Sequence, residues 1–173
     1  ALDNEQENLF EQIFAKHDLW IKTIFADDQE LQLAAFTIVN DYINELRNLL
    51  HSQSFSNQLQ LHDSVVSYGE KMSSALISLY LRSHGLNAEQ LLATKCIITT
   101  NNFGGADFID AATKKAAKKS ILPLVEQGVV PVITGFIGAT AKGETTILGR
   151  GGSDYSAAII GYAIDSEEIQ IWT

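Results

Sequence analysis

Residues 149–165 read GRGGSDYSAAIIGYAID, and this stretch decides the expected fold. Three glycines surround Arg150, and glycine lets the backbone approach a ligand closely and adopt conformations that other residues avoid. Ser153 and Asp154 are typical of a helix start, where free N–H groups and the positive end of the helix dipole attract anions. The run that follows is apolar on nearly every face, which is typical of a buried helix. We therefore expect a buried helix whose N-terminus presents a small polar loop at a cleft.

Around this stretch, residues 63–173 alternate between strand-like and helix-like segments. Strands separated by crossover helices imply an α/β protein with a largely parallel sheet, in which ligands sit beyond the carboxyl ends of the strands. A continuous β-branched run predicts a buried strand, and alternating apolar residues predict others. The expected strands or extended segments are residues 65–68, 91–93, 97–99, 129–134, 145–148 and 168–172, and helices are expected at 70–84, at 111–126 with an interruption near Pro123, and after the glycine-rich loop.

Residues 1–62 form a different, helical region. Apolar residues recur there at helical spacing, and Asp27 with Glu30 three positions later predicts a capping box at the start of a long helix. His17, His51 and His62 are scattered without ligand spacing, so no metal site is expected. The sequence therefore predicts a helical region at 1–62 and an α/β part at 63–173.

The composition fits one globular domain and excludes several partners. A chain of 173 residues can bury a core, and its net charge of −9 argues against binding to a nucleic-acid backbone. Four lysines between residues 114 and 119 are typical of the solvated face of a helix. Cys96 is the single cysteine, which fits a reducing compartment. It lies in an apolar run, which predicts a buried thiol. Without a signal peptide or an apolar run of membrane length we expect a cytoplasmic protein, and the start at Ala1 and the end in a strand-like segment suggest a piece of a longer one.

A small group of residues could carry chemistry. Arg150 could hold a carboxylate or phosphate through two parallel hydrogen bonds, or it could be a surface arginine. Glu70 could bind an ammonium group, or it could form a capping box with Ser67. Asp154 could favour the helix dipole or face a ligand, and Phe136 could be core or the wall of a cleft. The glycine pattern is neither the dinucleotide fingerprint nor a P-loop.

Taken together, four segments resemble the aspartate kinases of the amino acid kinase family. They hold a Ser-x-Gly-Glu, a Gly-Phe-Ile-Gly, a Lys-Gly and a Thr-Thr-x-Leu-Gly-Arg-Gly-Gly-Ser-Asp in the order and spacing of that family. The resemblance covers residues 63 to 173 and implies a three-layer α-β-α sandwich, incomplete in this chain. The segments are VSYGEKMSSALISLYLRSHG (66–85), NNFGGA (101–106), VITGFIGATAKGETTILGRGGSDYSAA (132–158) and IQIWT (169–173).

The resemblance implies a reaction, in which the γ-phosphoryl group of ATP passes to the side-chain carboxylate of L-aspartate. The product, 4-phospho-L-aspartate, leads to lysine, threonine, methionine and isoleucine. ATP and Mg²⁺ would be required, and the full-length protein would be a homo-oligomer. By the same resemblance, Arg150 would pair with a carboxylate of aspartate and Glu70 with its ammonium group. The remaining implied roles are the amino-acid pocket for Phe136, Gly151 and Ser153, the transferred phosphoryl group for Asp154, and the nucleotide for Thr173.

The sequence also departs from the family. No Lys-Phe-Gly-Gly-Thr-Ser segment precedes residue 63, and the nucleotide-binding half does not follow Thr173, so we expect this chain alone to lack kinase activity. Two alternatives are another amino-acid kinase, such as one that acts on acetylglutamate, and a non-catalytic amino-acid-sensing module.

Overall fold

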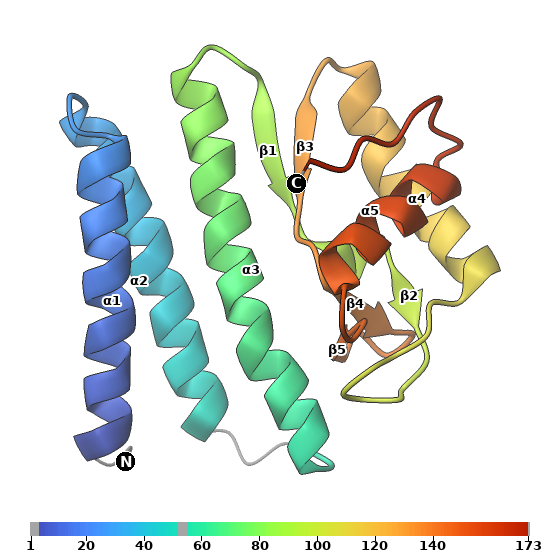
Figure 1. Ribbon diagram of the computed structural model, residues 1–173, viewed down its shortest axis with the longest axis horizontal. Coiled ribbons are helices and arrows are strands. Elements are labelled where there is room, and N and C mark those ends of the chain that lie inside the picture. The colour runs from blue at the N-terminus through green and yellow to red at the C-terminus, as the bar shows by residue number, and fades with distance from the viewer. Residues whose placement is uncertain (1–3, 52–54, 173) are drawn as a thin grey trace.

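The computed structural model describes residues 4–51 and 55–172, which form three long helices followed by a compact α/β part (Figure 1). Two helices form a hairpin, the third lies between this hairpin and the strands, and the last two helices cover the other side (Figure 1). The elements are α1 (Asn4–Ile24), α2 (Gln29–His51), α3 (Gln58–Ser83), β1 (Ala88–Leu91), the 3₁₀ helix η1 (Ala93–Lys95), β2 (Ile98–Thr99), α4 (Asp110–Glu126), β3 (Val130–Ile133), β4 (Ile137–Thr140), β5 (Thr145–Ile147) and α5 (Gly152–Ala163).

The predicted helical region is present as α1, α2 and the start of α3. The predicted capping box of Asp27 with Glu30 is wrong, because Asp28 caps α2 instead: it accepts the Leu31 N–H at 2.9 Å, and α2 begins at Gln29. Leu31 has no side-chain acceptor for a reciprocal hydrogen bond, so a simple N-cap replaces the box. The apolar faces of the three helices meet in one hydrophobic core. Its buried members are Phe10, Ile21, Phe25, Ala35, Val39, Ile43, Leu46, Tyr68, Met72, Leu76 and Leu79.

Helix α3 replaces the extended segment that was predicted at residues 65–68. Asn57 caps it by accepting the Gln60 N–H at 2.9 Å, and Gly85, with φ +81°, follows its end as predicted. Val65 packs against the helical core, whereas Val66 packs against the core of the α/β part. Packing on both sides therefore overrides the weak helix propensity of two adjacent valines. The expected boundary between residues 62 and 63 falls inside this helix.

The strands form two small sheets. β1 pairs in parallel with β3, and β2 pairs in parallel with β4, which pairs antiparallel with β5. Strand β4 was not predicted, because Gly138 and Ala139 have low strand propensity, yet β4 is buried along its whole length. A Cβ at Gly138 would lie 2.7 Å from Thr99 Cγ2, so the approach of β4 to β2 requires glycine.

Three further predictions about the strands need correction. The segment predicted at 91–93 is displaced, since β1 ends at Leu91 and η1 begins at Ala93. β3 is only partly buried, because it has a single neighbouring strand. Residues 168–172 form no strand, because they pair with no strand among the described residues and instead pass along α5, where Ile169 packs against Gly161.

Both C-terminal helices differ from prediction in one respect. α4 continues through Pro123, which is exposed near the helix end where water can replace the lost hydrogen bond. α5 is not buried on all sides: Ile159 and Ala163 face the core, while Tyr155 and Tyr162 are exposed. One face of α5 is therefore buried and the other is exposed to solvent, although the helix is apolar in composition.

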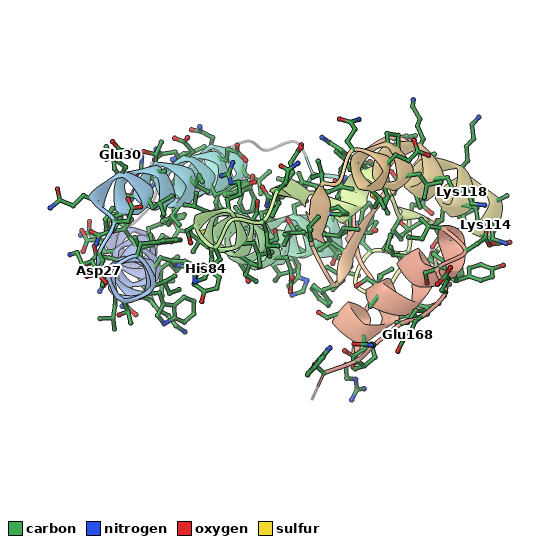
Figure 2. The ribbon with its side chains drawn as sticks, turned by 90° about the horizontal axis from the view of Figure 1, so that it is seen from above. Asp27, Glu30, His84, Lys114, Lys118 and Glu168 are labelled. Carbon is green, nitrogen blue, oxygen red and sulfur yellow. The ribbon has the colours of Figure 1, made fainter. Side chains whose placement is uncertain are left out.

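The α/β part has its own core, between α3 on one side and α4 with α5 on the other. The predicted α/β class with helices on both sides of a mostly parallel sheet is therefore confirmed. Lys114 and Lys118 lie on the side of α4 that faces the end of α5 (Figure 2), where Lys114 stands over the Tyr162 ring and Lys118 forms an ion pair with Asp165. Within the described residues no helix has both the length and the apolar composition needed to cross a membrane.

Candidate substrate-binding site

One small cleft brings together the residues that were singled out as candidates. It has a volume of about 360 Å³ and lies between α3, the turn after β3, and the loop from β5 to α5. Six of the seven candidates line it, and Thr173 lies outside the described residues. The lining residues are Glu70, Phe136, Gly149, Arg150, Gly151, Gly152, Ser153 and Asp154.

Glu70 enters the cleft from the middle of α3. It is not at a strand-to-helix junction and does not form a capping box with Ser67, because both residues lie within the helix. Ser67 is fully buried and its Oγ donates to the Ser64 carbonyl at 2.7 Å. Partial burial raises the pKa of Glu70, although a hydrogen bond from the Gly135 N–H favours the ionised form. An anion that is partly removed from water suits a cationic partner.

The N-terminus of α5 is built by glycine rather than by a capping side chain. Gly151 is the N-cap residue, with φ +69° and no side-chain hydrogen bond, so the predicted capping by Ser153 and Asp154 is wrong. Both side chains are exposed in the first turn and face the cleft. The first N–H groups of a helix lack partners within it and favour anions, and the exposed Arg150 precedes them. This wall of the cleft therefore suits a carboxylate or phosphate.

Phe136 has an unusual backbone. Its φ is +66°, a conformation that costs on the order of 1–3 kcal/mol outside glycine and that the surroundings must hold in place. Its N–H donates to Ser156 Oγ at 2.9 Å, and its carbonyl accepts the Leu148 N–H at 2.8 Å. A Cβ at Gly152 would lie 2.7 Å from Phe136 Cδ2, so the ring packs directly on the first turn of α5. Phe136 therefore lines the cleft and also packs, partly buried, against the core of the α/β part.

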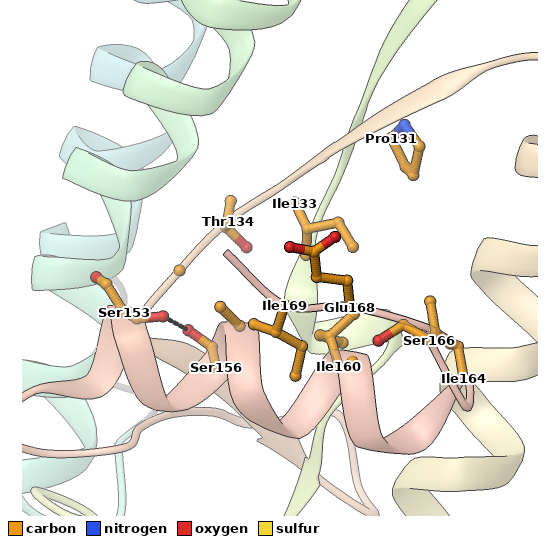
Figure 3. A pocket seen from close by; sticks show the side chains of 13 residues that line it. Pro131, Ile133, Thr134, Ser153, Ser156, Ile160, Ile164, Ser166, Glu168 and Ile169 are labelled. Atoms are coloured by element: carbon orange, nitrogen blue, oxygen red, sulfur yellow. Dashed lines mark hydrogen bonds between the residues drawn. The ribbon is translucent and has the colours of Figure 1, made fainter. Parts of the chain in front are cut away.

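A second cleft, of about 370 Å³, meets the first at Ser153 and runs along α5 beside β3 (Figure 3). Its lining is mainly apolar, with Pro131 and Ile133 on one side and Ile160 and Ile164 on the other, and Glu168 is the one charged residue in it. It does not combine charges of both signs. The first cleft is therefore the better candidate for a small zwitterionic ligand.

Two residues that support the cleft were missed in the sequence. Ser156 is buried, donates to the Gly152 carbonyl at 2.7 Å and accepts the Phe136 N–H, so it connects α5 to the strained turn. Asp63 is fully buried in α3 and accepts backbone hydrogen bonds from Gly104 and Ile147. The signal for Asp63 was its spacing: 63, 67 and 70 fall on one helix face once residues 58–83 are taken as a single helix.

No metal centre is found among residues 4–51 and 55–172, where no three His, Cys, Asp or Glu side chains lie close enough to hold an ion. Asp154 is the carboxylate on the anion-favouring wall of the cleft. Its position suits contact with a phosphate-bound cation rather than a complete metal site.

Comparison with known proteins identifies the relatives of this chain. It is 36% identical over 159 residues to Aspartokinase 1, chloroplastic, from Arabidopsis thaliana, an alignment that covers 90% of this chain and 27% of the relative. It is 38% identical over 125 residues to Lysine-sensitive aspartokinase 3 from Escherichia coli K12, which covers 72% of this chain and 28% of the relative. The chain therefore spans about a quarter of the length of these relatives.

Solved structures of aspartokinases are also similar to this chain. The chain superposes on E. coli aspartokinase III in complex with lysine and aspartate with a TM-score of 0.75 and 33% identity, covering 82% of this chain and 32% of that one. The same enzyme in complex with aspartate and ADP gives a TM-score of 0.71 and 35% identity, covering 78% and 30%. The model of the amino acid kinase family matches residues 11–173. This chain therefore belongs to the amino acid kinase family.

Proposed function

We propose that the protein that contains this chain is an aspartate kinase, which transfers the γ-phosphoryl group of ATP to the side-chain carboxylate of L-aspartate. The observation that carries the proposal is the cleft that brings Glu70 of α3 together with Arg150 and the glycine-rich start of α5. Aspartate is a zwitterion with one ammonium and two carboxylate groups, so it needs both charges in one small site. The relatives named aspartokinase, and the E. coli enzyme with bound aspartate and ADP, support this choice of substrates.

Each residue of the cleft has a role in the proposal. Glu70 binds the ammonium group, and Arg150 with the first turn of α5 binds a carboxylate. Phe136, Gly151 and Ser153 shape the pocket, and Asp154 lies beside the transferred phosphoryl group. Phosphoryl transfer depends on positioning and charge neutralisation, so rigid support of these side chains is what the chain would contribute. Thr173 would meet the nucleotide, and Mg²⁺ would enter with ATP, bound by its phosphates, by water and by one or two carboxylates.

Glu70 also separates the proposal from the acetylglutamate alternative. An N-acetylated amino acid has no ammonium group, so its binding would leave the half-buried Glu70 carboxylate without a cationic partner, which is unfavourable. The cleft therefore favours an acceptor with a free amine. No feature of the described residues favours the sensing module over the kinase.

The proposal is tested with the full-length protein, ATP and Mg²⁺, by trapping acyl phosphate as the hydroxamate. We expect product with L-aspartate and none with N-acetyl-L-aspartate or N-acetyl-L-glutamate. Equal turnover of the acetylated acceptors would contradict the role of Glu70. Binding of aspartate by calorimetry without any turnover would favour the sensing module instead.

A further inference from the structure

We propose that Asp63 is a positioning residue for the aspartate site, fixing Arg150 relative to Glu70. This inference rests on the proposed function. The two charged side chains come from separate parts of the fold: Glu70 from α3, and Arg150 from the loop after β5. Their spacing therefore depends on how α3 is attached to β5. Asp63 supplies a side-chain hydrogen bond in that attachment.

The Asp63 carboxylate is fully buried and accepts hydrogen bonds from the main chain. The Gly104 N–H donates to both oxygens, at 3.1 Å to Oδ1 and 2.9 Å to Oδ2, and the Ile147 N–H donates to Oδ2 at 3.3 Å. The exposed His62 ring lies beside it, with Nδ1 3.4 Å from Oδ1. Burying a carboxylate is costly unless hydrogen bonds replace its water, and these backbone groups supply them.

The contacts of Asp63 converge on the strand that leads to Arg150. Ile147 is the last residue of β5, and its carbonyl accepts the Ala106 N–H at 2.8 Å, so both of its backbone groups are held. The turn that contains Gly104 also lies against the start of the loop that carries Arg150. A Cβ added to Gly149 would be 3.8 Å from Gly105 Cα, which is van der Waals contact. Asp63 thus holds the strand and the turn on which the Arg150 loop rests.

The same face of α3 reaches the other side of the cleft. Asp63, Ser67 and Glu70 are spaced at i, i+4 and i+7 along the helix. Near the other wall, Glu70 lies beside the Gly135 N–H, in the turn just before Phe136. Helix α3 therefore contacts the α/β part beneath both walls of the cleft, and Asp63 makes the hydrogen bonds on the arginine side.

The test is Asp63→Asn in the full-length protein. The variant keeps the size of the side chain, but one carboxylate oxygen becomes an NH₂ group. Because NH₂ cannot accept a hydrogen bond from a backbone N–H, at least one of the hydrogen bonds is lost. We expect the KM for aspartate to rise while the KM for ATP stays within about twofold. The free energy of one hydrogen bond to a charged group, roughly tenfold to a hundredfold in KM, sets the upper limit of the rise, because the lost bond lies within the protein and not to the substrate. Asp107→Asn is the matched control, because it removes the same charge from an exposed position at the end of the same turn.

Steady-state kinetics separate positioning from general destabilisation. A variant that only lost folded protein would show a lower kcat with both KM values unchanged, and that result would overturn the inference. Equal KM values for aspartate in Asp63→Asn and Asp107→Asn would also overturn it. If the wild-type protein neither binds nor phosphorylates aspartate, the proposed function itself fails, which is a distinct result.

A measurement on the wild-type protein covers the case in which Asp63→Asn does not fold. Bound aspartate would connect Glu70 to Arg150 and so hold α3 against β5 more firmly. We expect hydrogen exchange at Gly104 and Ile147 to slow together when aspartate is added, with β1 and β3 unchanged. Exchange at these two amides that does not respond to saturating aspartate would contradict the inference.

Discussion

At the residue scale, the cleft depends on two side chains of opposite charge that differ in how far they are held in place. Glu70 is partly desolvated and accepts the Gly135 N–H, whereas Arg150 is exposed on a loop of glycines. The strained Phe136 is held between Ser156 and Leu148. The negative wall is therefore fixed in advance. On the positive side, the loop rests on the strand and turn that Asp63 holds, while the exposed Arg150 side chain itself can adjust to a ligand.

Replacing Arg150 with lysine should weaken aspartate binding without affecting the fold. Lysine keeps the charge but cannot form two parallel hydrogen bonds to a carboxylate, a loss of about 1.5–3 kcal/mol, or roughly tenfold to a hundredfold in the KM for aspartate. Arg82→Lys is the matched control, because Arg82 lies in the last turn of α3 outside this cleft. Steady-state kinetics of the full-length protein would measure both, and equal KM values would rule out a carboxylate contact.

Protonation of Glu70 should lower kcat/KM for aspartate at acidic pH, which gives the pH profile an acidic limb. Burial raises its pKa, so as pH falls the side chain loses its charge earlier than an ordinary glutamate would. We expect kcat/KM for aspartate to fall as pH drops through this raised pKa, and Glu70→Gln to lower kcat/KM and remove the limb. A wild-type profile that Glu70→Gln reproduces in shape would contradict the assignment.

The same shift affects stability with a defined sign. Because the pKa of Glu70 is raised in the folded state, folding favours its protonated form. This contribution to stability is complete below the unfolded pKa and is lost as pH rises through the folded pKa. Glu70 is thus ionised for binding at some cost to the fold, as is common at functional sites.

At the element scale, the packing of a helix against a neighbouring turn determines which of its glycines can be replaced by a larger residue. Gly152 begins α5 directly against the Phe136 ring, whereas a Cβ on Gly69, in the middle of α3, would meet nothing within 4 Å. Gly152 is therefore required because a side chain there would clash with Phe136. Gly69 makes no such contact and only weakens its helix.

The pair Gly152→Ala and Gly69→Ala should change stability in opposite directions. Gly69→Ala should stabilise the protein by about 0.5–1 kcal/mol, because alanine restricts the unfolded chain and favours helix. Gly152→Ala should destabilise it by about 1–3 kcal/mol through overpacking against Phe136, and should also raise the KM for aspartate. Chemical denaturation of both variants would measure this, and a shift of the same sign in both would contradict the packing argument.

Most elements of the fold could be predicted from the sequence because their hydrophobic pattern is local. α2, α4 and β3 follow from helical spacing or a β-branched run. The start of α3 could not, because Val65 and Val66 become helical only by packing against two different cores. β4 was missed because its buried glycine and alanine look unlike a strand, and residues 168–172 alternate like a strand but pair with none.

The candidate site could be predicted only as far as its local motif. Glu70, Phe136 and Arg150 stand in short segments that resemble a known family, and the structure brings them into one cleft. The long-range contacts of Asp63 and Ser156 carry no local signal. The N–H groups that donate to Asp63 lie 41 and 84 positions away, and the N–H that donates to Ser156 lies 20 positions away, so tertiary structure alone reveals these contacts.

At the scale of the whole molecule, α3 joins two hydrophobic cores. Its apolar face belongs to the core of the α1–α2 hairpin, and its polar face, with Asp63, Ser67 and Glu70, covers the strands. The α/β core lies between α3, which contributes Val66, and the two helices α4 and α5, and it contains Cys96. Labelling of this thiol therefore reports whether the α/β core is intact.

Cys96 should react with a disulfide reagent only when the protein opens. The thiol is fully buried, and burial raises its pKa to about 12, so hardly any thiolate exists in the folded state at neutral pH. We expect labelling by Ellman's reagent to be at least on the order of a thousandfold slower than in denaturant, where one thiol per chain should react. Fast labelling of the native protein would show that this core is open.

The placement of Glu70 and Arg150 on separate parts of the fold also bears on the order in which the protein folds. The two residues stand 80 positions apart, and they meet only after α3 docks on β5. Such a long-range arrangement costs loop-closure entropy and is completed late in folding. A ligand held between them therefore stabilises the native state but not the transition state, so aspartate would slow unfolding and leave the folding rate unchanged.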